Sequence, residues 1–426
     1  MAAAGSAVGL GNIWKFPYVA GENGGGAFLL VYLVCVLLFG MPLIMMEFYI
    51  GKRTGKSAYG AFRALSGNNR WQWLSWLCLT TAVVIMGFYF VVTGWCFSYL
   101  AEALAGRFSG MDTEALTAHF TSLTTNTPRM IFFSLLPVVL TALILLFSIN
   151  KGIERASKIL MPLLLLMMVL MVGRVLMLDG SNIGLRFFLH ADFSKITPRV
   201  VLEAMGQSFF SLSIGMGALI TYGAYMPPKQ NVPRASLQVV VLDTLVAFMA
   251  GLIVFPAVFA FGCNPAEGPQ LVFVVLPVIF QQMSLPWVSS VLFFALLGIA
   301  ALTSTISLME VGVAFIREAT APTKYPLGRR MSVCMVTGVT VLMVLLCVFI
   351  PRVFSSFDAA VSCVLMPLGA LGMAVLVGQM LSRQSERDRL IEKGYKPWTV
   401  WTYGFMLRGL VPTAILLIFL KGLGVF

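Results

Sequence analysis

The chain has 426 residues, of which 59% are hydrophobic and only 11% charged. A soluble domain carries about 25% charged residues, so this composition excludes a cytosolic enzyme, a disordered chain and a nucleic-acid-binding protein. The net charge is +12, and we expect the basic residues that cause it to lie at the surface of a lipid bilayer.

Long apolar stretches recur along the whole chain. A membrane-spanning helix needs about 20 apolar residues, and backbone polar groups in lipid must be bonded within the segment. Eleven stretches qualify: 2–22, 27–50, 73–104, 130–149, 159–177, 200–225, 236–262, 287–316, 331–350, 358–381 and 398–422. The predicted fold is an all-α polytopic membrane protein that forms one domain over residues 1–426.

Lys and Arg are unevenly shared between the two sets of alternate connections. The connections 51–72, 150–158, 226–235, 317–330 and 382–397 hold 19 of them, whereas the other set, with the C-terminal end, holds 7. The richer side is cytoplasmic. We therefore expect a multi-pass protein of the cell's inner membrane with its N-terminus in the cytoplasm and its C-terminus outside.

Two spans contain glycine clusters. Residues 5–12 read GSAVGLGN and residues 211–217 read SLSIGMG, and each glycine weakens a helix by about 1 kcal/mol. Breaks in the first and sixth spans predict two inverted five-helix repeats, 1–177 and 200–382, with 398–422 as an additional helix. The binding site of such a transporter lies at the broken helices. Close packing of small residues between helices is the alternative explanation.

Polar residues interrupt two further spans. Asp243 lies in the seventh, where a carboxylate is costly and is presumed functional, although a salt bridge or a helix-end role would also explain it. Thr303, Ser304 and Thr305 lie in the eighth. Such hydroxyls usually bond their own backbone, but next to a broken helix they can also be ligands of a hard cation.

Several sequence stretches carry a family resemblance. They are Gly5 to Lys15 with Phe16-Pro17, Glu22 to Phe28, Pro42 to Glu47, Lys151 to Arg155, Gln207 to Tyr225, and Thr303 onward. Together they resemble the neurotransmitter:sodium symporters, in particular the bacterial amino-acid-transporting branch with its leucine-transporter-like fold. The resemblance runs over almost the whole chain in the family's order.

The resemblance implies two sodium sites and a substrate site between the breaks. The first sodium site would use Ala7, Asn12, Ser211 and Asp243 with the substrate carboxylate, and the second Gly5, Val8, Ala300, Thr303 and Ser304. The substrate carboxylate would meet Tyr89 and the backbone amides near Leu10 and Gly11, and the amino group would meet Ser213. The side-chain pocket would consist of Leu10, Ile85, Phe210, Met216, Ser304 and Leu308.

Gly9 decides the substrate class that the resemblance implies. Monoamine-transporting relatives have an aspartate at this position, which replaces a carboxylate that their substrates lack. Because Gly9 has no side chain, the substrate must bring its own carboxylate. A neutral, hydrophobic or aromatic L-amino acid fits best.

The resemblance also implies residues that close the two sides of the transporter, and it bears on whether transport depends on chloride. Lys15 and Asp358 match residues that close the outer vestibule, and Tyr225 and Glu318 match parts of the cytoplasmic latch. At Ala247 bacterial relatives often carry an acid that replaces chloride. This acid is missing, and we expect Asp243 to supply the charge, so that chloride dependence is not expected.

The start of the chain departs from the family pattern, because relatives carry about one more half-helix ahead of Met1. The first repeat is therefore expected to be truncated, either through a start codon assigned too late or in a true paralogue with a leaky inner gate.

The predicted function is sodium-driven uptake by alternating access, with two sodium ions. A membrane enzyme would need a partner for Asp243 or Glu47, yet His119 and His190 fall in exterior connections. A binding or sensing protein without transport, and a proton-coupled transporter that uses Asp243, remain the other hypotheses. Neither the amino acid nor the oligomeric state follows from the sequence.

Overall fold

The computed structural model describes residue 5 and residues 7–147, 153–266, 268, 270–392 and 396–422. Within them the regular elements are helical. They are η1 (Gly11–Lys15), α2 (Phe16–Glu22), α3 (Gly26–Cys35), η2 (Val36–Gly40), α4 (Met41–Thr54), α5 (Ala58–Ser66), η3 (Asn69–Trp71), α6 (Gln72–Leu104), α7 (Thr113–Thr125), α8 (Thr127–Leu146), α9 (Ile153–Leu176), α10 (Ser181–Leu189), η4 (Phe193–Lys195), α11 (Pro198–Ser211), α12 (Ala218–Ala224), α13 (Val232–Ala260), η5 (Leu271–Val275), α14 (Leu276–Gln282), α15 (Pro286–Thr320), α16 (Arg329–Phe349), α17 (Pro351–Ala360), η6 (Val361–Leu365), α18 (Met366–Met380), α19 (Gln384–Glu392), α20 (Pro397–Arg408) and α21 (Leu410–Gly422).

By length and composition, nine helical segments among the described residues can cross a membrane. They are Gly26–Thr54, Asn69–Leu104, Thr127–Leu146, Ile153–Leu176, Val232–Ala260, Pro286–Thr320, Arg329–Phe349, Pro351–Met380 and Val400–Leu420. The expected spans outside this group are the first and the sixth, the two with glycine clusters. The all-helical polytopic fold is thus confirmed.

Both glycine clusters interrupt a helix. In the first span the chain bends at Val8 and Gly9 and continues through the wide turns of η1 into α2. In the sixth span residues 212–217 separate α11 from α12. The backbone φ is +56° at Ser213 and +94° at Gly215, values that an α-helix cannot contain.

The break in the sixth span is fixed by its neighbours. The fully buried Glu47 of α4 accepts a hydrogen bond of 2.7 Å from the Gly215 amide. On the other side, a Cβ at Gly369 of α18 would stand 2.3 Å from the Gly215 carbonyl oxygen. The buried carboxylate satisfies a backbone donor that lost its helical partner, as burial requires.

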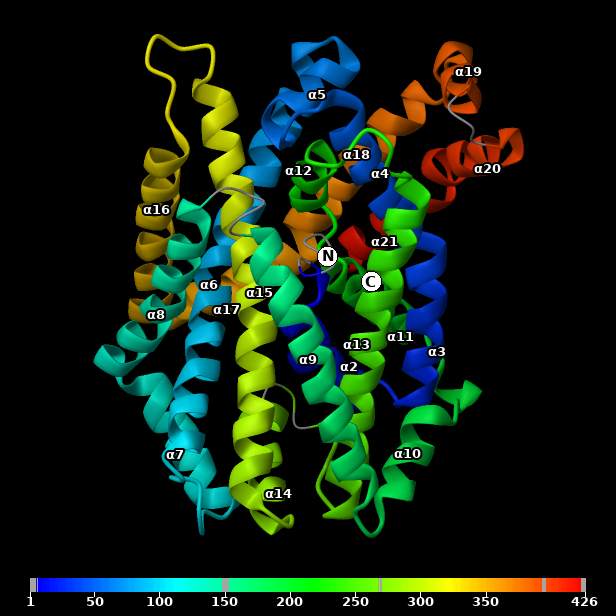
Figure 1. The fold of residues 1–426 in the computed structure, drawn as a ribbon. Coiled ribbons are helices and arrows are strands. Elements are labelled where there is room, and N and C mark those ends of the chain that lie inside the picture. Colours follow the sequence, from blue (N-terminus) through cyan, green and yellow to red (C-terminus); the bar gives the residue numbers. More distant parts are fainter. Residues whose placement is uncertain are drawn as a thin grey trace.

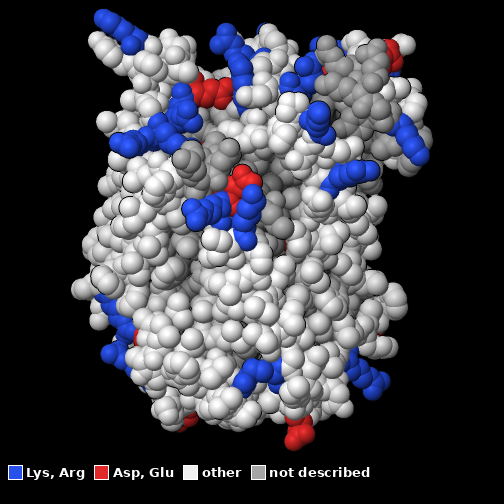
Figure 2. Space-filling model, viewed as in Figure 1, with Lys and Arg blue, Asp and Glu red and all other residues white. Residues whose placement is uncertain are grey.

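The connections gather at the two ends of the bundle (Figure 1). Helices α5 and α19 lie at one end, with the connections predicted to be cytoplasmic, and α7, α10 and α14 lie at the other. In the face that Figure 2 shows, Lys and Arg gather toward the end with α5, and a largely uncharged band lies below them. Figure 2 shows the same uneven distribution of Lys and Arg that the charge count uses, and the sidedness stays a prediction.

Several helices of the connections were not predicted. The expected span 398–422 is also divided, because α20 ends at Arg408 and α21 begins at Leu410. Residues 1–4 and 423–426, which bear on the sidedness of the chain ends, lie outside the described residues. The same is true of Lys151 and Gly152 in one family motif.

Candidate functional site

A polar cluster joins the two breaks to α13. The Asn12 side-chain amide donates to Ser211 Oγ (2.9 Å), to the Asp243 backbone oxygen (3.0 Å) and to Asp243 Oδ1 (2.7 Å). Ser211 Oγ lies 2.9 and 3.0 Å from the two Asp243 carboxylate oxygens. Three of the four residues predicted for the first sodium site therefore lie together. The fourth, Ala7, is buried and lines the adjacent pocket.

Tyr32 of α3 belongs to the same cluster and was not predicted from the sequence. Its hydroxyl lies 3.3 Å from Asp243 Oδ2 and 3.4 Å from Ser211 Oγ. Asn12 and Asp243 are both fully buried. A buried carboxylate normally requires a compensating cation or hydrogen bonds, and here uncharged donors and a hydroxyl surround it. Such an oxygen-rich group suits a hard monovalent cation.

A second oxygen cluster lies where α15 meets the first break. Thr303 Oγ1 donates to the carbonyls of Val8 (3.3 Å) and Ala300 (2.9 Å). Ser304 Oγ also lies 3.3 Å from the Val8 carbonyl. Four of the five residues predicted for the second sodium site are thus neighbours.

Gly5, the fifth residue predicted for that site, is placed against a different helix. A Cβ built on Gly5 would lie 3.4 Å from Ser157 Oγ of α9. No hydrogen bond among the described residues joins Gly5 to Thr303 or Ala300.

A cavity lies between the breaks. It is lined by Ala7, Gly9, Gly11, Ile85, Tyr89, Phe210, Ser211, Ser213, Met216, Ser304, Leu308 and Met366. Of the residues predicted for substrate, only Leu10 is outside this lining, and it is 1% exposed. Met366 of α18 was not predicted. Methionines are common in apolar spans, so the sequence does not distinguish a methionine that lines the site from one that does not.

Two backbone amides of the first break are already hydrogen-bonded to side chains. The Leu10 amide donates to Tyr89 Oη at 3.0 Å, and the Gly9 amide donates to Asn12 Oδ1 at 3.0 Å. A Cβ at Gly9 would lie 2.1 Å from Ser304 Oγ and 2.8 Å from Tyr89 Oη. Glycine at this position thus brings the backbone of the first break against α15 and α6.

The predicted outer gate residues are in contact. Lys15 Nζ lies 3.6 Å from Asp358 Oδ1 and 3.3 Å from Ser362 Oγ. It also lies 4.2 Å from the centre of the Phe210 ring, at the edge of the pocket. Lysine acts as a point charge, so this contact is less directional than an arginine pair.

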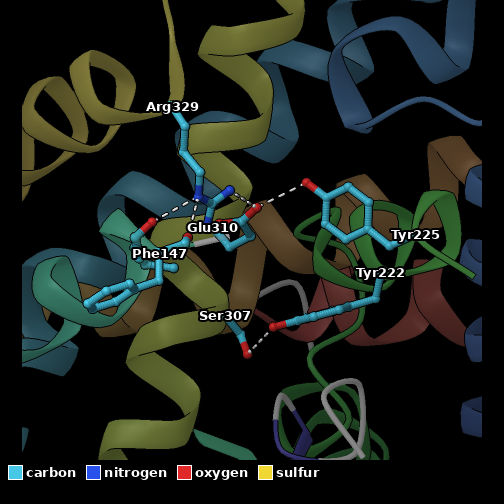
Figure 3. Close-up of polar contacts among 7 residues, drawn as sticks. Phe147, Tyr222, Tyr225, Ser307, Glu310 and Arg329 are labelled. Carbon is cyan, nitrogen blue, oxygen red and sulfur yellow. Dashed lines mark hydrogen bonds and ion pairs between the residues drawn. The ribbon is translucent and has the colours of Figure 1, made fainter. Parts of the chain in front are cut away.

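The predicted cytoplasmic latch has a different arrangement (Figure 3). Tyr225 Oη donates to Glu310 Oε1 at 3.0 Å, and the Arg329 guanidinium binds both Glu310 oxygens, at 3.0 and 2.7 Å. Nearby, the Tyr222 and Ser307 hydroxyls are 3.0 Å apart. Glu310 is 1% exposed, and its buried ion pair with Arg329 was not predicted from the sequence.

The other predicted latch residue, Glu318, has a different hydrogen-bond partner from Tyr225. Its carboxylate accepts from the Ser57 amide at 2.8 Å and also from the Ser57 hydroxyl. Ser57 is the N-cap of α5. Among the described residues, Glu318 thus joins α15 to α5 and Tyr225 joins α12 to α15.

The chain is similar to known sodium-dependent transporters. The family model of the sodium:neurotransmitter symporter family matches residues 1–111 and 125–426. A sodium-dependent transporter of Bacillus subtilis (strain 168), YhdH, is 36% identical over all of this chain and 96% of its own length. A sodium-dependent transporter of Haemophilus influenzae is 34% identical over 99% of this chain and 96% of its own length.

A solved structure shares the fold. The crystal structure of MhsT in complex with L-phenylalanine superposes with a TM-score of 0.89 at 38% identity, over 99% of this chain and 97% of that chain. The fold and the broken-helix site thus define a multi-pass membrane transporter, not an enzyme. The chain belongs to the sodium:neurotransmitter symporter family and is a sodium-dependent transporter.

Proposed function

We propose that the chain imports a neutral, hydrophobic or aromatic L-amino acid by sodium-coupled symport with alternating access. The observation that carries the proposal is the pocket around Gly9, which has apolar walls and is flanked by an oxygen cluster on each side. MhsT, whose structure contains L-phenylalanine, supports this substrate class. The repeats would be residues 1–177 and 200–382, with the N-terminus cytoplasmic in the inner membrane.

In this proposal the Tyr89 hydroxyl and the Leu10 and Gly11 amides bind the substrate carboxylate, and Ser213 binds the amino group. The cavity volume is only about 30 Å³, which is room for water alone. A phenylalanine side chain therefore requires Phe210 or the adaptable Met216 to move. Lys15 above the Phe210 ring links that movement to the outer gate.

We propose two transported sodium ions, one in each oxygen cluster. The substrate carboxylate would complete the coordination of the first ion, which would couple the two bindings. Asp243 would supply the negative charge that other members take from chloride, so that transport would not need chloride. Asp358 with Lys15 would close the outer side, and Tyr225 and Glu318 would belong to the inner closure.

Uptake of labelled L-phenylalanine into proteoliposomes tests the proposal. One charge crossing 100 mV releases about 2.3 kcal/mol, and a tenfold sodium gradient adds about 1.4 kcal/mol. Two ions would support accumulation of about 10⁵-fold and one ion of several hundred-fold. Uptake that is unchanged when choline replaces sodium would contradict the proposal, and uptake driven by a pH gradient alone would favour proton coupling.

A further inference from the structure

A cleft of about 250 Å³ lies at the bend between α20 and α21, far along the chain from the broken helices. Its walls include Arg387 of α19 and Trp401, Gly404, Phe405 and Arg408 of α20. Helix α19 packs against α20, at the end of the bundle predicted to be cytoplasmic (Figure 1).

Arg387 contributes a guanidinium to this cleft. Its central carbon lies 4.4 Å from the centre of the Trp401 ring, so that the ring supports one flat face of the group. Among the side chains that the structure describes, no carboxylate lies within ion-pair distance of Arg387. The in-plane N–H groups, which bind the two oxygens of a phosphate side by side, therefore have no acid to bind.

Arg408 contributes a second guanidinium in a fixed position. Its Nε donates to the Gly378 carbonyl at 3.1 Å, and Nη2 donates to the Leu381 carbonyl at 2.7 Å. These carbonyls end α18, which a cation stabilises. A Cβ at Gly404 would lie 3.5 Å from Nη2, in ordinary van der Waals contact, so the guanidinium lies close along the backbone of α20. The remaining nitrogen, Nη1, has no hydrogen-bond partner among the described residues.

The surroundings of the cleft are apolar and positively charged. Trp401 is 60% exposed and Phe405 is 74% exposed, and both belong to the apolar span Val400–Leu420. Residues 383–408 contain six basic and three acidic residues. One of the acids, Glu386, accepts from Arg53 and Tyr49 of α4.

We propose that this cleft binds the phosphate group of an anionic phospholipid, with the acyl chains along Trp401 and Phe405. Two guanidiniums against a single phosphodiester favour a lipid with net negative charge, because the cationic head of a zwitterionic lipid would be repelled. Tryptophan is typical of the level at which headgroups lie. The exposed aromatic surface favours a lipid over free phosphate, because only a lipid has acyl chains that can cover Trp401 and Phe405.

The test is a lipid titration of the full chain in detergent, read by native mass spectrometry, with phosphatidylglycerol and phosphatidylcholine as probes. We expect the first phosphatidylglycerol to bind at least about tenfold tighter than phosphatidylcholine. Arg387→Gln should abolish that preference. The control Arg63→Gln, which removes an exposed charge from α5 at the same end, should keep it.

A second variant and a competitor complete the test. Trp401→Leu keeps an apolar side chain but removes the stacked ring, and it should weaken the preference several-fold. Excess inorganic phosphate should not displace phosphatidylglycerol, because it has no acyl chains. The proposal is overturned if Arg387→Gln and Trp401→Leu both keep the preference, or if inorganic phosphate displaces the lipid completely.

Discussion

Asn12 and Asp243 are separated by 231 positions in the chain, yet Nδ2 of Asn12 lies 2.7 Å from Oδ1 of Asp243. The pair connects the first break to α13, and Ser211 brings the second break to the same carboxylate. A change at Asp243 thus affects both broken spans at once.

Asp243→Asn is expected to weaken the apparent affinity for sodium by at least about tenfold, because the site loses the negative charge that attracts the cation. Transport by the variant should become stimulated by chloride, since the site then lacks a negative charge. Sodium titrations of uptake, with chloride or gluconate as the anion, measure both effects.

The matched control restores the charge at a neighbouring position. Ala247 lies one turn beyond Asp243 on α13 and is fully buried. The double variant Asp243→Asn with Ala247→Glu should transport without chloride. If Asp243→Asn itself proves indifferent to chloride, Asp243 does not carry the charge role.

Gly9→Ala is expected to abolish L-phenylalanine binding. The added methyl would lie 2.1 Å from Ser304 Oγ, and the bend at Gly9 would have to move away from α15. Binding is measured as the ligand-induced rise in Tm, because a ligand that prefers the folded state stabilises it. The control is Gly173→Ala on α9, whose Cβ would meet no atom within 4 Å, and which should bind as the unaltered protein does. A normal Tm rise in Gly9→Ala would refute the close approach.

Arg329→Gln is expected to destabilise the protein by about 3–5 kcal/mol, because it leaves the Glu310 carboxylate buried without its cation. Adding Glu310→Gln to Arg329→Gln should recover part of the loss. Tyr225→Phe, which removes one hydrogen bond, should cost only about 1 kcal/mol. The comparison uses Tm in detergent. Equal losses in the single and double variants would mean that Arg329 acts mainly through the carbonyls of Leu145 and Phe147.

His119 of α7 should make stability depend on pH. It contacts the buried Glu102, which also binds Arg129, and burial together with Arg107 lowers the pKa of His119. The unfolded chain then takes up this proton first, so the contribution is complete above the ordinary histidine pKa of about 6.5 and is lost as the pH falls below it.

We expect the Tm to fall between about pH 7 and about pH 5.5, and to fall less in His119→Gln. His190→Gln, at an exposed histidine of the same end, should retain the full decrease. A steeper decrease in His119→Gln would mean that protonated His119 stabilises the fold by pairing with Glu102.

The sequence predicted the features that follow from backbone chemistry. The glycine clusters at 5–12 and 211–217 weaken a helix, and both interrupt their spans. Asp243 was predicted as functional because an isolated carboxylate in lipid is costly, and it lies at the centre of the cluster with Asn12.

Other features depend on side-chain positions that no local pattern encodes. Glu310 lies in an apolar run of α15, and its partner Arg329 begins the next helix. The resemblance suggested Glu318 for the latch, and the contact of Glu318 with Ser57 was not predicted. The break at Gly409 was not predicted, because hydropathy identifies an apolar stretch but not whether the helix in it is continuous. One apolar stretch can therefore contain two helices, as α20 and α21 do here.

Where Gly215 meets Gly369, main chain lies directly on main chain, and no rotamer can absorb a change there. A methyl group at residue 369 would clash with the Gly215 carbonyl oxygen and would shift residues 212–217. This segment contains Ser213 and Met216, both of which line the cavity. We therefore expect a substitution at Gly369 of α18, which does not line the cavity, to change which ligand the cavity accepts.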